Sequence, residues 1–153
     1  MSIKKIVLQQ IQSQVDRAAE TVRGLSVPKE GWIRTVRKSL GMSGAQLARR
    51  MDITRAAISN TEKAELEGRV TIKAMREAAE AMGCRLVYAI VPEKDIETLI
   101  RKRAREKAQA KVKKVNQHMA LEAQTLTSDR IDFEIERLTD ELVKNLPAEL
   151  WND

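Results

Sequence analysis

The chain of 153 residues is poor in the side chains on which most catalytic and metal sites depend. Cys84 is its only cysteine, so it cannot form an internal disulfide; we expect it to fill core space in a protein kept reduced in the cytoplasm. The only histidine, His118, has no cysteine or carboxylate cluster at ligand spacing around it. A glycine-rich phosphate loop and a nucleophile elbow are missing too. We therefore expect no catalytic residues, no metal and no cofactor.

Long apolar runs are also missing. The longest, LVYAIV at residues 86–91, is far shorter than the roughly 20 residues that a membrane-spanning helix needs. No apolar core of a signal peptide stands at the N-terminus, and we expect no membrane partner. The chain is instead rich in charge: 33 % of its residues are charged, with a formal net charge of +6. A basic balance of this kind favours a polyanionic partner such as nucleic acid.

Residues 44–63 have the pattern of two short helices joined by a sharp turn. Asp52 stands at the turn, where it tolerates a left-handed backbone, and Ile53 is expected to plug it. Thr54 is expected to cap the second helix. The expected contacts between the two helices come from one small and three larger apolar residues at helical spacing: Leu47, Ala48, Met51 and Ile58.

The outward face of the second helix is expected to read base edges in the major groove of DNA. Arg55 can reach O6 and N7 of a guanine, and Ala56 can touch a thymine methyl group. Phosphate contacts are expected at the helix N-termini and on the loop that follows, although each such residue could instead be a cap or a solvated charge. The expected base-reading residues are Arg55, Ala56, Ser59 and Asn60, and the expected phosphate contacts are Ser43, Gln46, Thr54, Lys63 and Arg69.

Helical spacing extends on both sides of this pattern. Residues 32–40 predict a preceding helix, and a further helix starts at Thr71 and stops at Gly83. The four helices in this order resemble the lambda-repressor-like (Cro, XRE) helix-turn-helix family over about residues 32–83. Two positions depart from the family: Gly44 stands where a phosphate-binding Gln is common, and Asp52 replaces the usual turn glycine. The resemblance implies a DNA-binding domain.

A wider resemblance covers nearly all of residues 5–150. The sequence SVPKEGWIRTVRKSLGMSGAQLARRM, with Gly31, Trp32 and Ile33 at the start of a helix, and the later EAMGCRLVYAIVP are similar to the family called mobile mystery protein A. This resemblance implies a bacterial antitoxin that represses its own operon and counteracts a Fic/Doc-type toxin encoded beside it. It also implies a cytoplasmic protein that is nucleoid-associated when bound to DNA.

We expect a mainly α fold in three parts. Residues 1–30 form an N-terminal helix and a turn, with an apolar face at Val7, Ile11, Val15, Ala18 and Val22. Residues 31–92 form the helix-turn-helix domain with a terminal strand, and residues 93–153 form a C-terminal helical region.

The strand at residues 85–91 has apolar side chains on both faces, with Leu86, Tyr88 and Ile90 on one of them. A lone strand leaves its backbone groups unpaired, so we expect it to pair with the same strand of a second copy in a homodimer. The alternative is an extended connector lying on the core.

The C-terminal region is expected to be a helical hairpin. Its first helix, over residues 93–123, is basic, and its second, capped by Ser128, is acidic. The acidic helix could pair with the basic one or with a basic partner. The basic face could instead be solvated, or contact phosphates or a toxin.

One short pattern, Ser26 to Gly31, fits the inhibitory motif of Fic proteins, in which Glu30 would pair with an arginine of the toxin. Pro28 would interrupt the helix that this motif requires, so Ser26 and Glu30 are weak candidates and a plain turn is the alternative.

Three functions remain open from the sequence. The first is a homodimeric antitoxin that binds operator double-stranded DNA. The second is a protein-interaction module that neutralises a toxin by contact. The third is a non-specific basic nucleic-acid binder.

Overall fold

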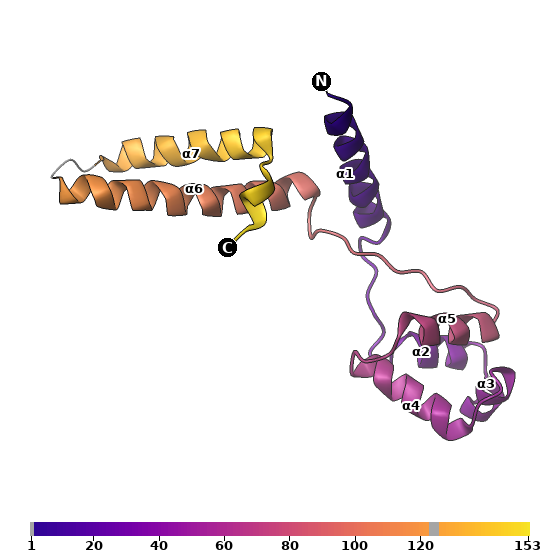
Figure 1. Cartoon of the computed structure of the whole chain (residues 1–153). Coiled ribbons are helices and arrows are strands. Elements are labelled where there is room, and N and C mark those ends of the chain that lie inside the picture. Colours follow the sequence, from indigo (N-terminus) through magenta and orange to yellow (C-terminus); the bar gives the residue numbers. More distant parts are fainter. Residues whose placement is uncertain (1, 123–125) are drawn as a thin grey trace. The chain divides into compact units, whose positions relative to one another are not determined.

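The computed structural model describes residues 2–122 and 126–153, which form seven α-helices and one short 3-10 helix (Figure 1). These residues contain no strand, and the expected mainly α fold is confirmed. The chain divides into two compact units: Gly24–Ala89, and Met1–Arg23 together with Ile90–Asp153. The first unit holds α2 (Trp32–Ser39), α3 (Gly44–Arg50), α4 (Arg55–Leu66) and α5 (Ile72–Ala81); the second holds α1 (Ile3–Thr21), α6 (Ile96–Leu121), α7 (Ser128–Asn145) and the 3-10 helix η1 (Ala148–Trp151).

Three helices of the Gly24–Ala89 unit begin at a hydroxyl side chain that accepts a backbone N–H of the first turn. Such a cap satisfies a helix donor that has no partner within the helix. The caps are Ser43 for α3, Thr54 for α4 and Thr71 for α5, and their donors are Gln46, Ala57 and Ala74. Ser43 and Thr54 therefore cap the helices that the sequence predicted.

The core of this unit is small and lies where the four helices meet. Leu47 and Ile58 are almost fully buried in it, and Ala48 beside them is buried as well. The small side chain of Ala48 leaves room for α4 to pack closely on α3. The complete buried cluster is Ile33, Leu47, Ala48, Ile58, Ala78 and Met82. Ile53, expected to plug the turn, is 38 % exposed, so that expectation was wrong. The turn is closed instead by the hydrogen bond from the Ile53 N–H to the Ala48 carbonyl, at 3.0 Å.

Two glutamates of α4 attach α2 to this core. Glu62 accepts hydrogen bonds from the Arg37 guanidinium at 2.7 and 3.2 Å, and both side chains are largely buried. Glu65 accepts the backbone N–H groups of Trp32 and Ile33, the first residues of α2. A carboxylate at a helix N-terminus also interacts favourably with the helix dipole. The position of α2 against α4 thus depends on two charged contacts.

Residues 85–91, where we expect a strand that pairs with a second copy, form no strand within the described residues of one chain. The segment is extended, but the described part of the chain offers no second strand with which its backbone could pair. In the single chain Tyr88 is 65 % exposed and Ile90 is 94 % exposed. Leu86, on the same alternating face as these two, is half-buried because it lies beside α2 and α5.

The second unit contains a helical hairpin, α6 and α7, whose seam is built from small side chains. Ala104 and Ala108 of α6 and Thr139 of α7 are fully buried. Thr139 donates its hydroxyl hydrogen to the carbonyl of Ile135, which satisfies this buried polar group within its own helix. Small side chains at these positions let the two helices approach closely. The N-cap of α7 is Thr127, not the expected Ser128, which is the first residue of the helix.

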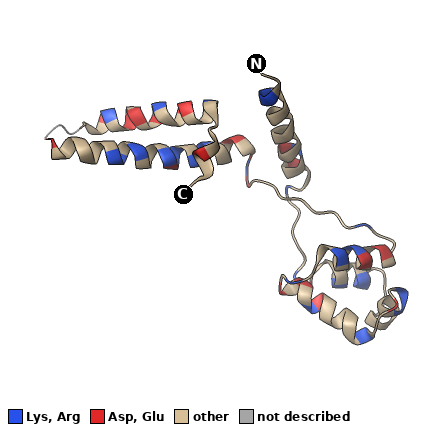
Figure 2. Ribbon diagram, in the orientation of Figure 1, with Lys and Arg blue, Asp and Glu red and all other residues tan. Residues whose placement is uncertain are grey.

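Charged residues occur along both helices of the hairpin (Figure 2), and some of opposite sign pair between α6 and α7. Arg101 contacts Glu136 and Asp140 at 3.3 and 2.6 Å, and Arg105 contacts Glu136 at 2.9 Å. Of the two alternatives left open for the acidic helix, pairing with the basic helix of the same hairpin is the one that these contacts show. These side chains are about half exposed, so each pair contributes at most about 1 kcal/mol of stability.

The ends of the second unit are fixed to α6. Asp16 of α1 accepts the backbone N–H of Ile96 at 2.8 Å. Asp95 caps α6, and hydrogen bonds from the side chain and backbone of Thr98 hold the pKa of its carboxyl below the usual range. Arg103 donates to the carbonyls of Leu150 and Asn152 at 2.8 and 2.7 Å. These contacts bring the C-terminal residues back onto the first half of the hairpin.

Only part of the apolar face predicted for α1 is covered. Val15, Ala18 and Val22 are half-buried, whereas Val7 and Ile11 are exposed at 47 % and 53 %. The N-terminal half of α1 therefore presents apolar side chains to solvent.

Candidate nucleic-acid interface

The outward face of α4 contains the four residues expected to read bases. Arg55, Ala56, Ser59 and Asn60 are all exposed, while Ile58 on the opposite side of the same turn is almost fully buried. The first two follow the Thr54 cap directly, so they lie at the N-terminal end of the helix. A helix that enters the major groove contacts base edges with this end. The side chains have the right chemistry: a forked cation, a methyl group, a hydroxyl and an amide.

The turn before α4 has the geometry that the sequence predicted. Asp52 adopts a φ of 56°, in the left-handed region, so the expected backbone at this position is confirmed. The short turn allows α3 and α4 to pack on each other through Leu47, Ala48 and Ile58. The orientation of the outward face is thereby set by the core and not by a flexible loop.

The residues expected to contact phosphates lie at both ends of this helix pair. Ser43 and Gln46 form a reciprocal capping box at the start of α3: the Gln46 N–H donates to the Ser43 hydroxyl, and the Gln46 amide oxygen accepts the Ser43 N–H. Thr54 accepts the N–H of Ala57 at 3.0 Å. Each cap still has a donor to offer, namely the hydroxyl hydrogens of Ser43 and Thr54 and the amide hydrogens of Gln46. A role as a cap and a role as a phosphate contact are therefore compatible.

Lys63 and Arg69 lie at the other end of α4, and both are close to the same carboxylate. Lys63 is seven residues after Ala56, so helical periodicity places the two on one face. The Lys63 ammonium lies 3.9 Å from Glu67, and the guanidinium of Arg69 is hydrogen-bonded to the same side chain. Glu67 partly neutralises the two cations that would meet phosphate.

Gly44, which departs from the family pattern, is the first residue of α3. A Cβ atom built on it would lie 3.8 Å from the nearest neighbour, a methyl carbon of Ile58, which is an ordinary contact distance. The position is therefore open to a longer side chain, and the glycine removes a possible phosphate contact without a packing reason.

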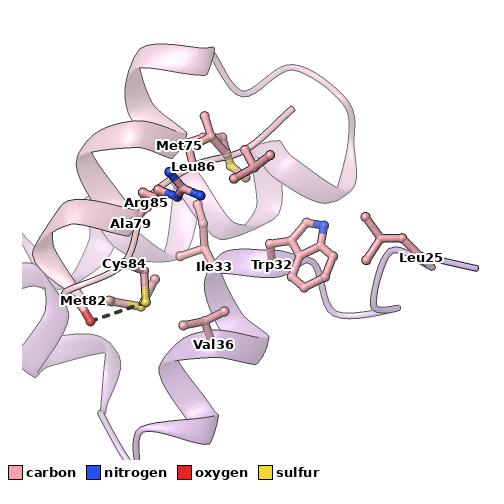
Figure 3. A pocket seen from close by; sticks show the side chains of 11 residues that line it. Leu25, Trp32, Ile33, Val36, Met75, Ala79, Met82, Cys84, Arg85 and Leu86 are labelled. Carbon is pink, nitrogen blue, oxygen red and sulfur yellow. Dashed lines mark hydrogen bonds between the residues drawn. The ribbon is translucent and has the colours of Figure 1, made fainter. Parts of the chain in front are cut away.

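The segment expected to join two copies forms one wall of an apolar pocket of about 310 Å³ (Figure 3). Trp32 and Val36 of α2 and Met75 of α5 form other walls. Leu86 lines this pocket, whereas Tyr88 and Ile90 do not. Cys84 also lines it but is exposed, so the expectation that it fills the core was wrong.

Ser26 and Glu30, the weak candidates for toxin inhibition, lie in a non-helical connector before α2. The N–H of Gly31 donates to the carbonyl of Pro28, which closes a turn there. Glu30 pairs with Lys38 at 3.0 Å, and this lysine lowers the pKa of the glutamate.

Several residues that position the interface were not predicted from the sequence. Glu62 and Glu65 hold α2, and Arg50 donates to the carbonyl of Ala81 at 2.6 Å, which ties α3 to the end of α5. Their partners are 25 to 33 residues away, so no local spacing signals these contacts.

Metal ligands do not gather in the part of the chain that the structure describes: no group of three or more His, Cys, Asp or Glu residues there could hold an ion. Among residues 2–122 and 126–153, no helix combines the length and apolarity needed to span a membrane.

Residues 33–88 match the model of the Helix-turn-helix family, and this segment includes α2 to α5 and the start of the extended segment after them. No curated protein matches the chain, and no solved structure matches it either. Domains of this family are DNA-binding and regulatory. The matched segment is thus an XRE-like, lambda-repressor-like helix-turn-helix domain, and the chain that carries it is a DNA-binding regulator.

Proposed function

We propose that the chain is an antitoxin of the mobile mystery protein A type. It binds operator DNA as a homodimer, represses the operon that encodes it and counteracts a Fic/Doc-type toxin in the bacterial cytoplasm. The DNA-binding part of this proposal is supported by the outward face of α4, where Arg55, Ala56, Ser59 and Asn60 are exposed on a helix anchored by buried Ile58. The toxin part is supported by sequence resemblance.

A homodimer is proposed because one recognition helix contacts too few base pairs for selectivity. Two helices related by a two-fold axis read half-sites about 34 Å apart. The extended segment at residues 85–91 supports this arrangement, since its backbone has no strand partner in the described residues and Tyr88 and Ile90 are exposed. Antiparallel pairing of two such segments would satisfy the backbone groups and cover these side chains.

A direct inhibitory role for Ser26 and Glu30 is a separate and weaker proposal. It requires residues 26–31 to become helical and Glu30 to exchange Lys38 for an arginine of the toxin. Repression of transcription requires neither change.

The test is operator binding by the full chain, measured by fluorescence anisotropy on its own upstream region with and without competitor DNA. Arg55→Ala should weaken operator binding by about 1–3 kcal/mol, or roughly 5- to 150-fold, because a bidentate contact to guanine is lost. Binding to unrelated DNA should change far less.

Arg76→Ala is the matched control, because it removes the same charge from an exposed position on α5. Helical circular dichroism should be unchanged in both variants. If the two variants bind the operator within twofold of each other, Arg55 does not read a base and the proposed orientation of α4 is wrong.

A further inference from the structure

A groove of about 810 Å³ runs between α1 and the α6–α7 hairpin, within one compact unit. Val7, Leu8 and Ile11 line it from α1, and Ile100, Val143 and Leu146 line it from the hairpin. The three residues of α1 are more than one third exposed. Apolar walls that remain open to solvent are typical of a site that receives another apolar surface.

The rim of the groove carries an excess of positive charge. Lys4 and Lys5 of α1 and Lys144 of α7 line it, and Glu97 is the only acidic residue among the residues that line it. All four side chains are exposed, and no ion pair in the described residues involves any of them. The groove therefore combines apolar walls with a rim of net charge +2, the sum of three lysines and one glutamate.

The apolar walls and the basic rim together indicate which kind of molecule fits the groove. DNA has no apolar surface to match the walls. In a two-fold pairing of two copies through this groove, one basic rim would meet the other, which is a repulsive arrangement. An amphipathic helix with an apolar stripe and acidic flanks matches both the walls and the rim.

We propose that this groove binds a partner protein through an amphipathic helix with acidic flanks. The inference rests on the proposed function in one respect: the toxin is the partner expected to supply that helix. It adds a surface, on the unit that does not carry the helix-turn-helix, through which the regulator would hold its partner.

The experiment uses the full chain and two synthetic helical peptides of about 18 residues, long enough to span roughly 27 Å. Both peptides carry the same apolar stripe, flanked by Glu in one and by Lys in the other. Binding is measured by fluorescence anisotropy at two salt concentrations. The Glu-flanked peptide should bind about tenfold or more tightly than the Lys-flanked peptide, and added salt should reduce the difference.

Charge reversal locates the binding surface. The triple variant Lys4→Glu, Lys5→Glu, Lys144→Glu should reverse the preference between the peptides. The matched triple variant Lys111→Glu, Lys113→Glu, Lys114→Glu changes the net charge equally at exposed positions of α6 that do not line the groove. It should keep the preference for the acidic peptide. The proposal is overturned if both triple variants behave alike, or if the wild-type protein binds the two peptides equally.

Val7→Ser with Ile11→Ser tests the apolar walls without adding charge. This variant should no longer bind the Glu-flanked peptide, whereas its circular dichroism and its operator affinity should be unchanged. If the protein alone instead changes from dimer to monomer in sedimentation, the groove holds a second copy and the proposal is wrong. Operator binding by the wild type is measured in parallel, so a failure of the proposed DNA function is seen separately from a failure of the groove.

Discussion

Two residues with left-handed backbone conformations fix the geometry of the DNA-binding unit. Asp52 could be placed from the sequence, because it stands between two helical patterns where a sharp turn is required. Gly31 could not be explained from the sequence alone. Its φ is 82°, and a Cβ atom there would lie 2.9 Å from the carboxyl group of Glu65. The glycine is needed both for its backbone and for the space that it leaves to the glutamate.

Gly31→Ala should therefore destabilise the unit by about 1–3 kcal/mol, because it adds backbone strain and pushes Glu65 away from the N–H groups of α2. The measurement is urea unfolding followed by Trp32 fluorescence in a Trp151→Phe background. Gly41→Ala is the control: φ is +66° there too, but no atom lies within 4 Å of the added Cβ. Equal destabilisation by the two variants would mean that the contact with Glu65 contributes nothing.

The contacts of Arg37 with Glu62 could not be predicted from the sequence. The pair is 25 residues apart. With 28 basic and 22 acidic residues in the chain, opposite charge alone does not select a partner. The pair follows from the packing of α2 on α4, which in turn depends on side-chain shapes that periodicity does not specify.

Among the secondary-structure elements, helices were easier to predict than the extended segment. Thr54 could be identified as a cap because its hydroxyl and the backbone N–H that it accepts, that of Ala57, are only three residues apart. Two adjacent hydroxyl residues, Thr127 and Ser128, shifted the predicted start of α7 by one position. Residues 85–91 form no strand within the described residues of one chain, because a strand exists only with a partner, and apolar alternation does not supply one. Pairing with a second copy stays a prediction.

Two substitutions at the C-terminal end of α4 should change DNA affinity and its salt dependence in opposite directions. Lys63→Gln should weaken binding to all DNA sequences about equally and reduce the salt slope by about 1, since one phosphate contact is lost. Glu67→Gln should strengthen binding to all DNA sequences and increase the salt slope, because it removes the carboxylate that Lys63 and Arg69 share. Both effects are read from binding constants measured over a range of salt concentrations. Unchanged slopes in both variants would remove this end of α4 from the DNA footprint.

At the scale of the whole molecule, the sequence indicated a helix-turn-helix domain with helical appendages, and the domain itself is supported by the family match at residues 33–88. It did not indicate that α1 and the C-terminal hairpin form one compact unit. That grouping depends on contacts between residues far apart in the chain, such as Asp16 with Ile96. The dimer that the proposed function requires stays a prediction.

Tyr88→Pro tests that dimer. Proline removes one backbone N–H in the middle of the 85–91 segment, so antiparallel pairing of two copies should weaken. Sedimentation should shift from dimer to monomer, and operator binding should fall far more than non-specific binding. Tyr88→Ala is the control that removes the side chain but keeps the N–H, and it should retain more of the dimer. A Tyr88→Pro protein that still sediments as a dimer would place the joint elsewhere.

The discontinuous unit affects the order in which the protein folds during synthesis. Residues 24–89 emerge from the ribosome before most of the hairpin has been made, so the helix-turn-helix can fold early. Helix α1 is made before this unit, yet Ile96 and Ile100, which it faces within its own unit, come more than 70 residues later. At a synthesis rate of about 5–20 residues per second, Val7 and Ile11 are present for several seconds before these neighbours have been made. During that interval the nascent N-terminal helix is open to chaperones, and to other nascent copies on the same messenger RNA.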